Sequence, residues 1–250
     1  MSDAARLVAR LYGGARGVVA PTAAGFALIG AVCGWADRVA PAWRADPFAA
    51  LGARRGALGD DRAVTGAVAA AVRALGFGPT TLVDRPRLRI ITPDGAPDAA
   101  VFVAHRDTWY GCPAGQVNLW WPLDDVGPER ALAFYPEVFA RAVPNTSAGF
   151  DYAAWQREVG WHGDAPVARY PTVAPGVDLG APSRCAVRAG GVLMFSGHQL
   201  HATQPLARGA RPRLSVDVRL VMPGGAEAVR VDDQSQGAAA RLAAEFRAVG

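Results

Sequence analysis

Two histidines and an aspartate have the residue types and the order that a metal site needs. His105 and Asp107 lie two positions apart where an apolar run ends, and residues with this spacing share one face of a β-strand. His201 follows 96 residues later. Two imidazoles and one carboxylate fill half of an octahedron, which suits non-heme Fe(II) and oxygen chemistry. We therefore expect His105, Asp107 and His201 to be the metal ligands and the catalytic centre.

His198 is the rival for the third ligand position. It lies three residues before His201, so on a regular strand the two side chains face opposite ways and only one can point inward. His201 is nearer to the next motif, so we expect His198 to lie at the surface or behind a ligand. Taken alone, His105 and Asp107 would also fit a salt bridge with Arg106 at the end of a strand.

An arginine and a serine follow His201 with strand spacing. Arg213 and Ser215 share one face, and a guanidinium with a nearby hydroxyl is what the distal carboxylate of a co-substrate needs. Arg211 lies on the same face and competes for this role. An arginine at an edge strand would otherwise simply face solvent.

Four segments carry a resemblance to a known family; in order, they read HRDTWY, QVNLWWPL, MFSGHQLHATQPL and RLSVDVR. The chain resembles the Fe(II)/2-oxoglutarate oxygenases, and within them the phytanoyl-CoA dioxygenase-like branch, over residues 101–221. It is most similar to bacterial members that modify sugar-containing natural products such as orthosomycin and aminoglycoside antibiotics. The resemblance implies Fe(II), 2-oxoglutarate and O2 as cofactors. It also places Asn118 and Trp120 on a strand that lines the 2-oxoglutarate pocket, and the third metal ligand in the Leu-His-Ala setting of His201.

Aromatic residues predict how a substrate is held. Flat rings suit stacking on sugars, although aromatic residues also fill cores. We expect residues 145–172 to form an insertion that closes over a polar, ring-bearing substrate such as a glycoside. The candidate substrate contacts are Trp109, Tyr110, Trp155, Trp161 and His162. For His162, the alternative is an ordinary loop residue.

The predicted fold is mainly β with flanking helices, a double-stranded β-helix (jelly roll, cupin-like) within one domain of residues 1–250. Residues 1–78 are Ala-rich with helical spacing, most clearly over 62–75. The spacing of residues 234–249 predicts a C-terminal helix, whose core-facing residues would be Leu242, Ala243, Phe246 and Ala248. Residues 79–222 form the jelly-roll core, with a short helix at 152–159 inside the insertion. Its expected strands are 81–92, 100–105, 116–123, 131–135, 185–188, 191–195, 200–203 and 212–222.

Composition excludes several function classes. The chain has no lysine, so a P-loop, a Schiff base and a kinase-type lysine are impossible. The net charge of +4 comes from scattered arginines, so nucleic acid is not an expected partner. Three cysteines without metal spacing favour a reduced cytoplasmic location. Residues 17–36 carry no charge, but their Pro and Gly content favours a buried helix near 22–32 over a membrane span. The sequence carries no feature that indicates an oligomeric state.

Other functions fit part of the pattern. A non-catalytic jelly-roll module could hold a metal with the same triad, but a carboxylate clamp at Arg213 would then have no purpose. A metal-dependent isomerase or hydrolase of the cupin type would usually use more histidines than the four present. An oxygenase acting on a lipid, acyl or amino-acid substrate is a further alternative. The resemblance also implies oxygenation and not chlorination, because halogenases of this superfamily carry a small residue at the position of the Asp107 carboxylate.

Overall fold

The large sheet of the protein has seven antiparallel strands, with the order β1-β7-β4-β9-β2-β10 and β3 also paired to β9. This computed structural model describes residues 3–93, 102–113, 115–159, 170–222 and 231–249. The strands of this sheet are β1 (Gly17–Val19), β2 (Leu82–Val83), β3 (Arg87–Ile91), β4 (Gln116–Pro122), β7 (Val192–Ser196), β9 (Arg213–Val221) and β10 (Arg247–Ala248).

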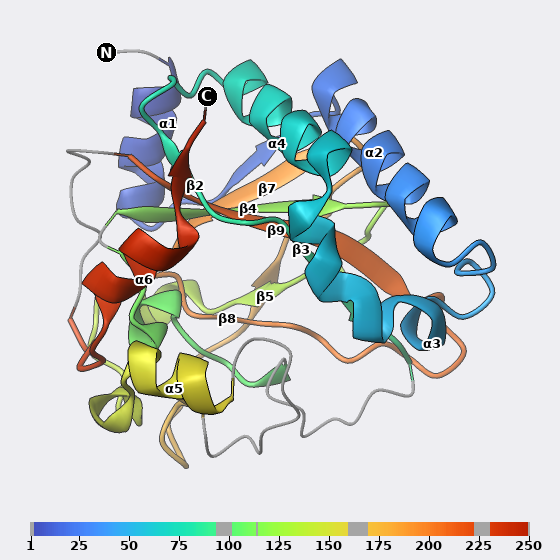
Figure 1. The fold of residues 1–250 in the computed structure, drawn as a ribbon. Coiled ribbons are helices and arrows are strands. Elements are labelled where there is room, and N and C mark those ends of the chain that lie inside the picture. Colours follow the sequence, from blue (N-terminus) through green and yellow to red (C-terminus); the bar gives the residue numbers. More distant parts are fainter. Residues whose placement is uncertain (1–2, 94–101, 114, 160–169, 223–230, 250) are drawn as a thin grey trace.

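Helices cover one face of this sheet. Thr22 caps the longest helix by accepting a hydrogen bond from the Gly25 amide, and Asp61 caps another through the amides of Ala63 and Val64. Figure 1 shows α2 and α4 on one side of the large sheet and β5 and β8 on the other. The helices of this layer are α1 (Asp3–Tyr12), α2 (Ala23–Val39), α3 (Pro47–Leu51), the 3-10 helix η1 (Gly52–Asp60) and α4 (Arg62–Ala74).

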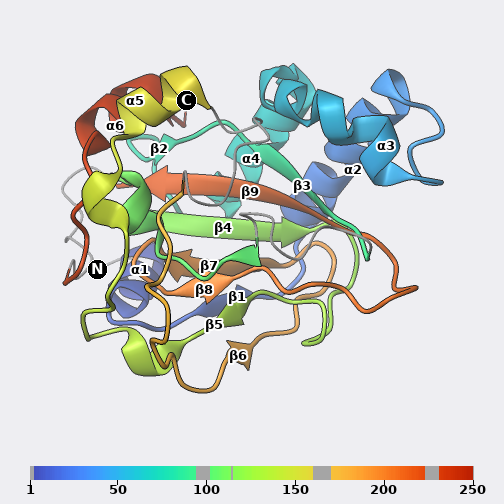
Figure 2. The ribbon, with the colours of Figure 1, turned by 90° about the horizontal axis from the view of Figure 1, so that it is seen from below.

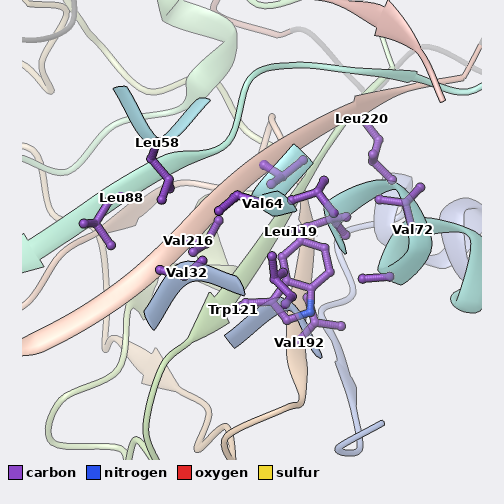
Figure 3. Close-up of a cluster of buried hydrophobic side chains, with 14 of the residues drawn as sticks. Val32, Leu58, Val64, Val72, Leu88, Leu119, Trp121, Val192, Val216 and Leu220 are labelled. Atoms are coloured by element: carbon purple, nitrogen blue, oxygen red, sulfur yellow. The ribbon is translucent and has the colours of Figure 1, made fainter. Parts of the chain in front are cut away.

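Side-chain alternation divides the large sheet into two chemically different faces. On β4, Val117, Leu119 and Trp121 point toward the helices and enter the main apolar core. Figure 3 shows Leu119 and Trp121 beside Val32, Val64 and Val72 of the helical layer. The remaining residues of β4 face the other way, toward the second sheet. The helix-facing side therefore builds the main core, whereas the opposite face combines the polar Gln116 and Asn118 with the apolar Trp120.

The second sheet is small and lies across from this second face. It has the order β6-β5-β8, with β6 (Ser183–Arg184), β5 (Ala133–Phe134) and β8 (His201–Ala202), and Figure 2 views the molecule from the side on which these strands lie. Two further helices, α5 (Tyr152–Glu158) and α6 (Ala238–Glu245), pack together at one end of the molecule. Two sheets with one helical layer confirm the predicted fold class.

Individual elements depart from the predictions in three places. Of the expected strand 100–105, residues 102–104 are irregular and His105 makes only an isolated bridge; residues 100 and 101 lie outside the described part. The expected strand 81–92 is split into β2 and β3 at Asp84–Pro86, because Pro86 has no N–H for a ladder and Asp84 bonds the Arg219 amide through its side chain. The expected strand 185–188 contributes only a bridge between Val187 and Val126.

The C-terminal helix is shorter than predicted, and its buried face is different. α6 ends at Glu245, and Arg247–Ala248 form β10. Phe246 is buried as predicted, but Ala243 and Ala248 are exposed and Leu242 is only half-buried. Arg241 takes the buried position because its charge pairs with Glu245 and it donates to the Tyr110 carbonyl. The helices predicted at 22–32, 62–75 and 152–159 are confirmed, and no helix among the described residues is long and apolar enough to cross a membrane.

Candidate metal centre

His105, Asp107 and His201 come together between the two sheets. One ligand atom from each lies within 4.8 Å of the others, and the Nε2 atom of His105 is 3.5 Å from Oδ1 of Asp107. The two imidazole centroids are 4.6 Å apart. Three donors at this spacing could surround one cation and leave the remaining positions open.

Backbone pairing aligns the two histidines, but a helical turn places the aspartate. The amide of each histidine donates to the carbonyl of the other, at 2.9 and 3.0 Å. Asp107 then begins the 3-10 helix η3 (Asp107–Tyr110) instead of continuing a strand. Strand alternation is therefore the wrong reason for the convergence of His105 and Asp107. Gly111 ends the turn with φ +60°, and a side chain there would meet the Gln236 carbonyl at 2.8 Å.

Hydrogen bonds set the tautomer of both imidazoles. Nδ1 of His105 lies 2.8 Å from the Val103 carbonyl, and Nδ1 of His201 lies 3.0 Å from the Gln199 carbonyl. A carbonyl can only accept, so each Nδ1 carries the proton and each Nε2 presents a lone pair. Burial, together with the charge of His105, lowers the pKa of His201 to about 4. His201 is therefore neutral at neutral pH, which is the state in which an imidazole can bind a metal.

The Asp107 carboxylate is held through one oxygen only. Its Oδ2 accepts hydrogen bonds from Nδ2 of Asn118 at 2.7 Å and from Nε2 of Gln116 at 3.0 Å, and Nε of Arg219 lies 3.8 Å away. Burial alone would raise the pKa of Asp107, but the adjacent His105 side chain and the Arg219 charge hold it well below its usual range. Oδ1 remains directed at His105, so the ionised carboxylate has one oxygen fixed and one available.

Arg219 is a site residue that the sequence reasoning missed, although alternation along β9 places it on the face of Arg213 and Ser215. Its Nη1 is 3.2 Å from Oδ2 of Asp84, whose side chain is completely buried. Burial would lower the pKa of Arg219, but Asp107 and Asp84 outweigh that effect and raise it. Asp84 carries no sequence signal, because only the fold brings it to β9.

Arg213 is buried, with a relative exposure of 1%. It donates through Nη1 to the Arg130 carbonyl, its guanidinium lies 5.6 Å from the centre of the Trp120 ring, and its Nε has no hydrogen-bond partner. Burial lowers its pKa to about 10. Ser215 lies on the same face and donates to Asp217 at 3.4 Å. The competitor Arg211 has a 73% exposed side chain that pairs with Asp124, so it faces solvent.

The structure decides between the alternatives left open for His198 and for the salt bridge. His198 is completely buried, so of its two expected positions the surface one is wrong, and it contacts Arg106 outside the cluster of ligand atoms. Arg106 pairs with Asp232, at 3.2 Å, and not with Asp107. The salt bridge considered for His105, Arg106 and Asp107 is therefore absent from the described residues.

The predicted substrate contacts lie mostly inside an aromatic core. Trp109 has no exposed surface and donates to Asp232 at 2.8 Å, and Trp155 packs with Phe150 and Tyr152. Neither ring presents a face to a substrate, because both fill the space between η3 and α5; the expectation for them is wrong. Tyr110 stands edge-on to the His105 ring, with 5.0 Å between centroids, and donates to the Pro171 carbonyl. Trp161 and His162 lie outside the described residues.

Comparison with solved structures gives three matches with a TM-score of 0.51. The epimerase SnoN, in complex with Fe3+, alpha ketoglutarate and nogalamycin RO, is 18% identical over 91% of this chain and 95% of its own. The non-heme monooxygenase ThoJ is 19% identical over 91% of this chain and 85% of its own. EvdO2 from Micromonospora carbonacea var. aurantiaca is 15% identical over 94% of this chain and 96% of its own. No protein-family model and no curated protein matches the sequence.

The chain has the fold of these enzymes. The match extends over nearly the whole of each chain, so the helical layer and both sheets belong to the shared architecture. At this level of identity, the likeness concerns the fold alone. The chemistry must therefore be argued from the residues of the site.

Proposed function

We propose that this chain is a non-heme Fe(II)- and 2-oxoglutarate-dependent oxygenase whose metal ligands are His105, Asp107 and His201. The observation that carries the proposal is the convergence of two Nε2 lone pairs and one carboxylate oxygen within 4.8 Å. Both Nδ1 atoms and the other carboxylate oxygen are already hydrogen-bonded, so only the converging atoms remain for a metal. The fold supports the proposal, since SnoN was solved with Fe3+ bound and ThoJ is a non-heme monooxygenase.

The surroundings of Arg213 fit a carboxylate. Among the described residues, no Asp or Glu lies within ion-pair distance of this buried guanidinium, and its Nε lacks an acceptor. A bound carboxylate would supply both the counter-charge and the acceptor. Ser215 offers a hydroxyl from the same face, and Trp120 provides a flat wall. We assign Arg213 and Ser215 to the distal carboxylate of 2-oxoglutarate.

The side chains of this protein would bind, orient and exclude water, while bound Fe(II) would supply the oxygen chemistry. Phe134 stacks on the His201 ring at 5.9 Å and Phe195 meets its edge at 4.8 Å, so an apolar wall backs this ligand. Asn118 and Gln116 hold Oδ2 of Asp107 in position by hydrogen bonds. Asn118 thus serves a ligand in this proposal, whereas the sequence assigned it to the 2-oxoglutarate pocket.

We further propose a polar small-molecule substrate, with a glycoside intermediate of natural-product biosynthesis as the favoured class and the cytoplasm as the location. Support comes from Arg89 and Asp217, which pair at 2.9 Å on the same sheet face as Arg213 and keep 35% and 23% of their side chains exposed. A partly exposed cation and anion suit hydroxyl groups better than an acyl chain. SnoN, which shares the fold, was solved with nogalamycin RO bound. Hydroxylation and oxidative ring closure are both compatible with this site.

The proposal is tested by anaerobic titration. Fe(II) and 2-oxoglutarate together should produce a weak visible charge-transfer band in the wild type. Arg213→Met should require much more 2-oxoglutarate to reach the same band, because the buried counter-charge is gone. Arg211→Met is the matched control and should behave as wild type, since Arg211 is solvent-exposed. No band in wild type with both components bound, or an equal effect of the two substitutions, would contradict the proposal.

A further inference from the structure

Arg106 lies between two proposed metal ligands in the sequence and is completely buried. Its guanidinium gathers three separate segments of the chain. It donates to the carbonyls of Val138 at 2.6 Å, Arg141 at 3.0 Å, Phe139 at 3.1 Å and His198 at 2.9 Å, and its Nη1 is 2.5 Å from Nε2 of His198. Its Nε faces Asp232 at 3.2 Å. One side chain therefore connects the His105 segment to the loop after β5, to the turn before β8 and to residue 232.

His198 shares its polar surroundings with Arg106. Its Nε2 lies 2.5 Å from Nη1 of Arg106 and 3.1 Å from the Phe139 carbonyl, to which Arg106 also donates. The imidazole therefore belongs to the same buried polar cluster as the guanidinium. Phe139 packs edge-on against the same ring, with 5.2 Å between centroids, so the ring is fixed in position as well as in hydrogen bonding.

The position of this pair gives it a relation to the metal site. The backbone bridge aligns His105 with His201 but does not include Asp107, which follows the turn into η3. Arg106 is the residue at that turn, and His198 lies in the turn between β7 and His201. The amide of Thr108 also bonds the Gly197 carbonyl, at 3.2 Å, so the same two turns lie against each other on both sides of Asp107.

We infer that Arg106 and His198 are positioning residues that fix Asp107 relative to the two imidazole ligands. The inference rests on the proposed metal site. Its competitor is a purely structural role, in which the pair holds the chain together without affecting the ligands. A structural role changes the stability of the fold and leaves the metal affinity of the folded protein unchanged. A positioning role changes the metal affinity of the folded protein.

The experiment is a titration of the metal-free full chain with Co(II), followed by the visible absorption of the bound ion. His198→Leu keeps an apolar side chain of useful size but removes the ring nitrogens that contact Arg106 and the Phe139 carbonyl, and we expect Co(II) affinity to fall about 10- to 100-fold, the range typical of groups that orient metal ligands. His198→Gln places a carboxamide, which can both accept and donate, near the position of Nε2 and should bind Co(II) nearly as wild type does. Val72→Ala, in the helical layer, is the stability control, because it opens a cavity remote from the site and should leave Co(II) affinity unchanged.

Three results would overturn the inference. The first is wild-type Co(II) affinity in folded His198→Leu, which would leave the pair with a structural role only. The second is an equal loss in His198→Leu and His198→Gln, which would make His198 itself a ligand. The third is a wild type that binds no Co(II), which refutes the proposed metal site as well.

If His198→Leu does not fold, Asp232→Asn replaces it, because this substitution removes the counter-charge of Arg106. Weakened Co(II) binding in Asp232→Asn supports the inference, and unchanged binding overturns it.

Discussion

Asn118 offers the sharpest separation between a ligand-orienting role and a co-substrate-binding role. Its Nδ2 donates to Oδ2 of Asp107 at 2.7 Å, and both side chains are buried. A hydrogen bond to a charged group contributes about 1.5–3 kcal/mol. Asn118→Leu removes this bond but leaves the Gln116 donor in place, so we expect a loss of metal affinity at the lower end of about 10- to 100-fold. The carboxylate would then be free to turn its second oxygen toward the metal.

The assay compares two constants in the same preparation. The metal dissociation constant of Asn118→Leu should rise, while the KM for 2-oxoglutarate, measured at saturating Fe(II), should remain near the wild-type value. Asn145→Leu is the control, because it removes a half-buried amide that donates to the main-chain carbonyls of Val143 and Asp232, at 2.8 and 3.0 Å, and not to Asp107. A raised KM with unchanged metal affinity would refute the reasoning and return Asn118 to the 2-oxoglutarate pocket.

Burial and charge lead to three more predictions. The metal-free protein should lose about 3 kcal/mol of stability between pH 6.5 and pH 4. The reason is that the unfolded chain protonates His201 in this range, while the folded chain, in which His201 has a pKa of about 4, does not. Urea unfolding at several pH values should show this fall of the free energy of unfolding in wild type and a smaller fall in His201→Gln. Trp155→Ala should cost about 3–5 kcal/mol in thermal or urea unfolding, because the ring is core, and a normal melting temperature with a raised substrate KM would instead restore its predicted contact role. With Asp107 present, turnover in chloride buffer should give oxygenated product, and mass spectrometry that finds chlorinated product would contradict this ligand set.

Much of the fold could be predicted from the spacing of the apolar residues and from the residues that begin and end each element. The apolar alternation of residues 116–123 and 212–222 identifies the two central strands, because one face of each must enter a core. The helix over 62–75 follows from its spacing and its Asp61 cap. The small sheet was harder to predict. β5 and β8 have two residues each, so neither is long enough to show a period, and His105 depends on a single bridge to His201 for its place.

The site was predictable where residue type alone limits the chemistry. The order of His105, Asp107 and His201 identified donors that the fold gathers. The aromatic residues were ambiguous, because Trp109 and Trp155 would serve a core and a sugar face equally well in a sequence. Asp232 had no signal at all, since its partners lie about 90 and 125 residues earlier in the chain and depend on the loop geometry.

The buried arginines separate structural charge from functional charge. Arg106 faces Asp232 at 3.2 Å and Arg219 faces Asp84 at 3.2 Å, so each has its counter-ion within the protein. A buried ion pair is tolerated when it is complete, whereas a buried cation without its partner is costly. Among the described residues, Arg213 has no such carboxylate, and its Nε has no acceptor. In the proposed function, the distal carboxylate of 2-oxoglutarate would complete this ion pair, and the missing partner distinguishes Arg213 from Arg106 and Arg219, whose counter-ions belong to the protein itself.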